Sequence, residues 1–73
     1  MSEITADYRG YKILVLATGL EPPIRGRYVV MHPSGIVQPV ATGTVEGMPD
    51  HLAAEDAAMA AARSAVDAFH ARS

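Results

Sequence analysis

Apolar residues along the chain follow two kinds of pattern. Between residues 11 and 41 they come in short runs of β-branched and aliphatic side chains that glycine and proline separate, which is typical of strands. From residue 51 onward glycine and proline are absent and alanine dominates, which is typical of a helix. The pattern therefore predicts an α+β domain in which strands come first and one helix closes the chain.

Three strands are predicted from the apolar runs. The loop after the first contains two consecutive prolines, and a type I turn over residues 32–35 fits between the second and the third. The third contains Pro39, which cannot donate to a ladder, so this strand should lie at a sheet edge or carry a bulge. The strands are assigned to residues 11–18, 27–32 and 36–41, with loops over 19–26 and 42–49.

The helix is predicted over residues 51–71. Asp50 precedes it and is the best candidate for its N-cap, because the carboxylate can accept a hydrogen bond from a first-turn amide. One apolar stripe recurs at helical spacing and should pack on the sheet. Its members are mostly small, so the helix can approach closely: Ala58, Ala61, Ala62, Ala65, Val66 and Phe69.

These elements together predict a β-β-β-α domain, a three-stranded antiparallel β-meander packed against one C-terminal α-helix. We expect a single α+β domain over residues 10–73. Residues 1–9 are polar and short of large apolar groups, so they are read as a flexible N-terminal tail. With 73 residues, of which 13 are alanine, the core should be thin, and a partner surface would help to stabilise it.

The first two predicted strands are apolar on both faces. A sheet covered by a helix on one side should alternate apolar and polar residues, yet both faces of residues 11–18 carry aliphatic side chains. Isolated surface aliphatics are normal, which is the ordinary explanation. The sharper interpretation is an association face, whose candidate residues are Leu14, Leu16, Val29 and Met31.

Two partners fit such a face, a second copy of the chain or another protein. The sequence does not fix the hairpin register, so it leaves open which face the helix covers. An edge strand could also add to a partner's sheet, and residues 11–18 are the candidate edge because they lack proline. The leading hypothesis is therefore a non-enzymatic protein-interaction or accessory module that uses the helix-free sheet face.

Charge supplies the alternative function, weak nucleic-acid binding through basic hairpin residues. A candidate basic patch comprises Arg9, Lys12, Arg25 and Arg27, and tyrosines lie nearby, as in nucleic-acid grooves. The net charge is −2 and the pI is about 5.8, so the basic footprint of such proteins is missing. We accordingly expect a protein partner rather than nucleic acid.

Candidate chemistry is sparse. The chain has no cysteine, and His32, His51 and His70 are spread along it without a spaced carboxylate cluster, so we expect no metal site and no cofactor. No sequence context marks a nucleophile or an oxyanion hole, so we expect no enzymatic activity. The acidic, polar start resembles no signal peptide and no run is long enough for a membrane helix, which favours a cytoplasmic protein.

Two resemblances accompany these residues. The β-β-β-α order is similar to the second part of double-stranded RNA-binding domains, but His51 through Asp56 stand where that family has a basic run. The segment from Tyr8 to Val15 and the acidic, alanine-rich helix from Glu55 to Asp67 resemble small uncharacterised domains of Gram-negative bacteria. This second resemblance implies a sheet with a helix and supplies no activity, cofactor or catalytic residue.

Overall fold

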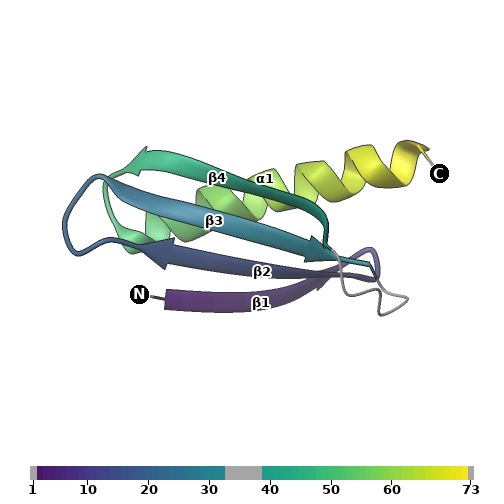
Figure 1. Cartoon of the computed structure of the whole chain (residues 1–73), viewed down its shortest axis with the longest axis horizontal. Coiled ribbons are helices and arrows are strands. Elements are labelled where there is room, and N and C mark those ends of the chain that lie inside the picture. The colour runs from purple at the N-terminus through teal and green to yellow at the C-terminus, as the bar shows by residue number, and fades with distance from the viewer. Residues whose placement is uncertain (1, 33–38, 73) are drawn as a thin grey trace.

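The described part of the chain forms a four-stranded antiparallel sheet with one helix across a single face (Figure 1). The computed structural model describes residues 2–32 and 39–72. Strand order in the sheet follows the chain, so each strand pairs with its sequence neighbours. The elements are β1 (Ser2–Tyr8), β2 (Tyr11–Thr18), β3 (Ile24–Met31), β4 (Pro39–Met48) and α1 (His51–Arg72). The α+β class and the C-terminal helix are confirmed.

The prediction of three strands is wrong, because residues read as an N-terminal tail form β1. Ile4, Ala6 and Tyr8 alternate with polar residues, and β1 pairs with β2 along its whole length. A two-residue turn of Arg9 and Gly10 joins them, with φ values of 54° and 84°. Positive φ at both turn residues is the type I′ geometry whose twist matches two paired strands. This short turn makes the polar start part of the sheet.

The positions and bounds of the other three strands also differ in part from the prediction. Residues 11–18 form β2, as predicted, but β2 lies between β1 and β3 and is not the edge strand expected from its lack of proline. β4 extends to Met48, so most of the predicted loop over 42–49 is strand. β3 starts at Ile24, inside the predicted loop over 19–26. The predicted turn at 33–35 and the predicted strand residues 36–38 lie outside the described residues.

β4 is the edge strand that Pro39 predicted. Pro39 stands opposite Met31, and the β3–β4 register shifts between Val30 and Met31 and again between Ile24 and Gly26. These irregularities interrupt the ladder where a residue without an N–H can be accommodated. The expectation that this strand lies at an edge or carries a bulge is met by its edge position.

The helix begins as predicted. The amide of Ala53 donates a hydrogen bond of 2.8 Å to Oδ1 of Asp50, so Asp50 is the N-cap. The buried face of α1 consists of Ala54, Ala58, Ala62 and Val66, which are all fully buried. This face lies over β2, β3 and β4 and makes little contact with β1.

Small residues let the helix come close to the sheet. A Cβ on Gly26 would lie 2.6 Å from the carbonyl oxygen of Ala54, so α1 passes directly over the β3 backbone there. Below the helix the core is filled from the two central strands by Ile13, Val15, Ile24 and Val30. These residues identify the face of the sheet that α1 covers. The pairing register of the strands then determines which side chains lie on the opposite face.

Candidate interaction face

The open face, the side of the sheet away from α1, has an apolar centre. Leu14 stands opposite Val29, and Met31 and Leu16 occupy the neighbouring levels of the same two strands. All four side chains are partly exposed, whereas the residues between them in β2 are fully buried against the helix side. The four candidate interaction residues therefore lie together, on the central pair of strands.

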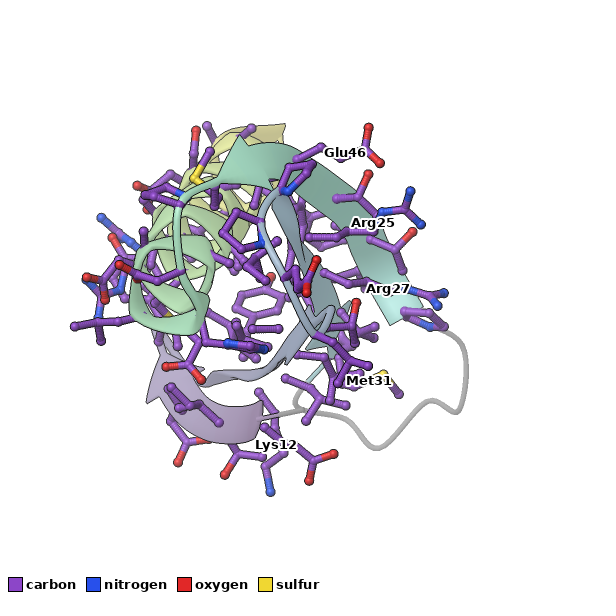
Figure 2. The ribbon with its side chains drawn as sticks, turned by 90° about the vertical axis from the view of Figure 1, so that its left-hand side faces the viewer. Lys12, Arg25, Arg27, Met31 and Glu46 are labelled. Atoms are coloured by element: carbon purple, nitrogen blue, oxygen red, sulfur yellow. The ribbon has the colours of Figure 1, made fainter. Side chains whose placement is uncertain are left out.

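Charged side chains of both signs surround this centre. On β1, Glu3 stands opposite Leu16 and Asp7 stands opposite Lys12. On the other side, Arg25 and Arg27 project from β3, and Figure 2 shows them with Lys12, Met31 and Glu46 on the side away from the helix. The face is neutral overall, because it carries three cations and three carboxylates: Lys12, Arg25 and Arg27, and Glu3, Asp7 and Glu46.

The charges are not distributed evenly over the open face. Arg25 is paired with Glu46, with 2.6 Å between Nη2 and Oε1. Among the described residues, Glu3 and Arg27 form no ion pair within the chain, although both are exposed. An unpaired carboxylate thus lies on the β1 side, and an unpaired guanidinium lies on the β3 side.

A shallow open depression of about 370 Å³ marks the β3–β4 side of the open face. Arg27 and the hydroxyl-bearing residues Thr42 and Thr44 line it, together with Leu16, Thr18, Arg25 and Gly43. A guanidinium and hydroxyl groups are hydrogen-bond donors suited to a carboxylate. The depression can therefore receive an acidic side chain from a partner.

The predicted basic patch is only partly assembled. Lys12, Arg25 and Arg27 share the open face, but Arg9 lies in the β1–β2 turn and its guanidinium reaches the helix. Nε of Arg9 is 2.8 Å from Oδ1 of Asp67, and the Tyr8 hydroxyl donates a hydrogen bond of 3.0 Å to the same carboxylate oxygen. The neighbouring Tyr8 side chain and the Asp67 carboxylate raise the pKa of Arg9 above its ordinary value. Arg9 and Tyr8 therefore connect the β1–β2 hairpin to α1 through Asp67.

The histidines lie in different surroundings. His32 packs edge-on against Tyr11 and Phe69, with ring centroids 5.6 Å and 6.4 Å away. His51 and His70 are near opposite ends of α1. Within residues 2–32 and 39–72, no three His, Asp or Glu side chains gather closely enough to hold a metal ion. In the same part of the chain, no helix has the length and apolar character needed to cross a bilayer.

Sequence reasoning missed the residues that frame the face. Glu3, Thr5 and Asp7 belong to β1, where the sequence pattern predicts a tail. Thr42 and Thr44 belong to the part of β4 where the pattern predicts a loop. The missed signal is the strict alternation of polar and apolar residues over residues 3–8. The segment is short and its central apolar residue, Ala6, is small, so the alternation is a weak signal.

Comparison with protein-family models, curated proteins and solved structures found no match to this chain. The resemblances to Gram-negative bacterial domains and to double-stranded RNA-binding domains stay predictions.

Proposed function

We propose that this protein is a non-enzymatic module that binds a protein surface through the open face of its sheet. The observation that carries the proposal is the apolar centre of that face, where Leu14, Leu16, Val29 and Met31 stay partly exposed on the two central strands. An apolar centre with a polar rim is the ordinary composition of a protein interface. Burial of this centre by a partner would remove aliphatic surface from water.

The small core gives the same face a second reason to be covered. The fully buried side chains are few and mostly small, with Ile13, Ile24, Val15, Val30 and Val66 the largest. A domain of this size buries only about 60% of the surface that its unfolded chain exposes, so a partner on the open face would add stability. The cysteine-free composition fits a cytoplasmic setting, since small extracellular domains commonly depend on disulfides.

The alternative, weak nucleic-acid binding, has less support. Arg9 is paired with Asp67 and Arg25 with Glu46. Lys12 and Arg27 are therefore the two cations of the basic patch that form no ion pair among the described residues. The three carboxylates of the open face would also repel phosphates. A face without net charge lacks the electrostatic term that drives non-specific nucleic-acid binding.

Site-specific photo-crosslinking in cells that express the chain tests the proposal. A photoreactive amino acid at Thr5 or Thr42, which are exposed on the rim of the open face, should give a covalent adduct with a protein. The same amino acid at Ser64, which is exposed on α1, should give none. The combination Leu14→Lys and Leu16→Lys should abolish the adduct because it places ammonium groups in the apolar centre.

The mass of the adduct identifies the partner. A protein adduct from both rim positions supports the proposed function, whether its mass corresponds to a second copy or to another chain. Adducts that form equally from Ser64, or that contain nucleic acid instead of protein, would overturn it. The absence of any adduct from either rim position would overturn it as well.

A further inference from the structure

We propose that the occupant of the open face is the open face of a second copy of this chain. The two sheets would pack face to face about a two-fold axis that runs parallel to the strands, between β2 and β3. This inference rests on the proposed function and names its partner. Aligned packing of two sheets at about 30° is a common arrangement in proteins.

The register decides which residues meet across such an axis. A two-fold axis parallel to the strands exchanges β2 with β3 and β1 with β4, and it keeps each cross-strand level opposite the same level. Thr5, Leu14, Val29 and Thr42 form one level, and Glu3, Leu16, Arg27 and Thr44 form the next. Leu14 of one copy therefore lies over Val29 of the second copy, which places aliphatic groups at the centre.

The charges of the open face are complementary to those of a second copy. Glu3 of one copy would lie over Thr44 of the second copy and beside its Arg27. Arg27 and Thr44 line the open depression on the β3–β4 side, so the depression receives the carboxylate of Glu3. The symmetry repeats this contact, so the dimer contains two equivalent Glu3–Arg27 pairs. Glu3 and Arg27, which form no ion pair among the described residues, each gain one.

The neutrality of the face removes the usual penalty for self-association. Identical surfaces that carry a net charge repel each other, but this face combines three cations with three carboxylates. The axis places β1 of one copy over β4 of the second, so Glu3 comes beside Arg27 on the adjacent β3 and opposite signs meet there. A partner of strongly acidic or basic chemistry would not match this arrangement.

The small size of the open face limits the affinity expected for the dimer. Four strands at about 4.8 Å spacing and roughly seven residues at about 3.3 Å rise give a footprint of roughly 19 by 23 Å. Such a footprint, roughly 440 Å² per copy, is smaller than a standard specific interface and is in the range of weak, transient ones. We expect a dimer with a dissociation constant on the order of 10 µM, which a concentration series can detect.

Sedimentation velocity across a concentration series of the full chain tests the inference. The wild type should pass from monomer to dimer as its concentration rises through the micromolar range. Glu3→Arg and Arg27→Glu should each weaken the dimer at least tenfold, since each variant faces like charges across the axis. Ser64→Arg, which changes charge on the exposed side of α1, should leave dimerisation unchanged. Backbone amide spectra verify that each variant is folded.

An equal mixture of the two charge variants is the decisive measurement. In a heterodimer of Glu3→Arg with Arg27→Glu, one contact keeps its original charges and the other has them reversed, so both become attractive. The mixture should dimerise within about threefold of the wild type, whereas each variant alone should not.

Three results would overturn the inference. A wild type that stays monomeric up to about 1 mM excludes the homodimer, while a crosslink from Thr42 to a different protein would still support the proposed function. A dimer insensitive to both charge variants would have to use another surface, such as the free edge of β1. Two weakened variants whose mixture fails to dimerise would exclude the two-fold axis described here.

Discussion

Two glycines show how closely side chains and backbone are packed at single positions. At Gly26 an added Cβ would lie 2.6 Å from the Ala54 carbonyl oxygen and 2.8 Å from Cγ2 of Val45. At Gly43 an added Cβ would lie 2.5 to 2.6 Å from the ring and hydroxyl of Tyr28, its partner across the strands. The first obstacle is helix backbone, and the second is the end of a side chain that can rotate away.

Alanine substitutions at these positions should therefore differ in cost. Gly26→Ala should lower the free energy of unfolding by roughly 2–3 kcal/mol, because α1 would have to move away from the sheet. Gly43→Ala should cost less, since Tyr28 can give way. Urea denaturation measures both values.

Gly47 provides the control, since nothing lies within 4 Å of its added Cβ but its φ is +76°. Gly47→Ala should cost about 1 kcal/mol through backbone strain alone. A Gly26→Ala variant as stable as Gly47→Ala would contradict the close contact between α1 and β3.

At the scale of elements, β1 changes what the sheet can do. It covers one edge of β2, which makes residues 11–18 an interior strand and removes the augmentation edge that was expected there. It also supplies Glu3, Thr5 and Asp7 to the rim of the open face. The free edges of the described sheet are β1 and β4.

Amide hydrogen exchange distinguishes this strand from a tail. In β1, about every second amide should be protected, because an edge strand directs alternate N–H groups toward its neighbour. The amides of Leu20 and Glu21, in the β2–β3 loop, provide an exchanging reference, since the Leu20 residue is 100% exposed. Rapid exchange throughout residues 3–8 would show that β1 does not pair stably with β2.

At the scale of the whole molecule, electrostatics separates protein binding from nucleic-acid binding. The chain carries a net charge of −2, and the structure pairs two of the four predicted patch cations with carboxylates. Titration with a short RNA or DNA duplex at about 20 mM salt should leave the amide signals of Lys12 and Arg27 unmoved. A shift that disappears as salt is raised would instead favour the nucleic-acid alternative.

Several features of this protein could be predicted from sequence because their signals are local. The helix followed from a stretch without glycine or proline, and the Asp50 N-cap followed from one carboxylate placed before it. The bounds of β2 followed from an aliphatic run between glycines. Pro39 placed its strand at an edge because a missing N–H has the same consequence in any sheet.

The open face depended on long-range pairing and could be predicted only in part. The sequence by itself determined that residues 11–31 are apolar on both sides and that a single helix follows, so some aliphatic groups had to remain uncovered. Only the tertiary structure decided the β2–β3 register, which set Leu14 beside Val29, and the addition of β1 and the length of β4, which framed them with Glu3 and Thr44. Hydrophobic pattern is a property of neighbouring residues, whereas register and strand partners are set by contacts between distant segments.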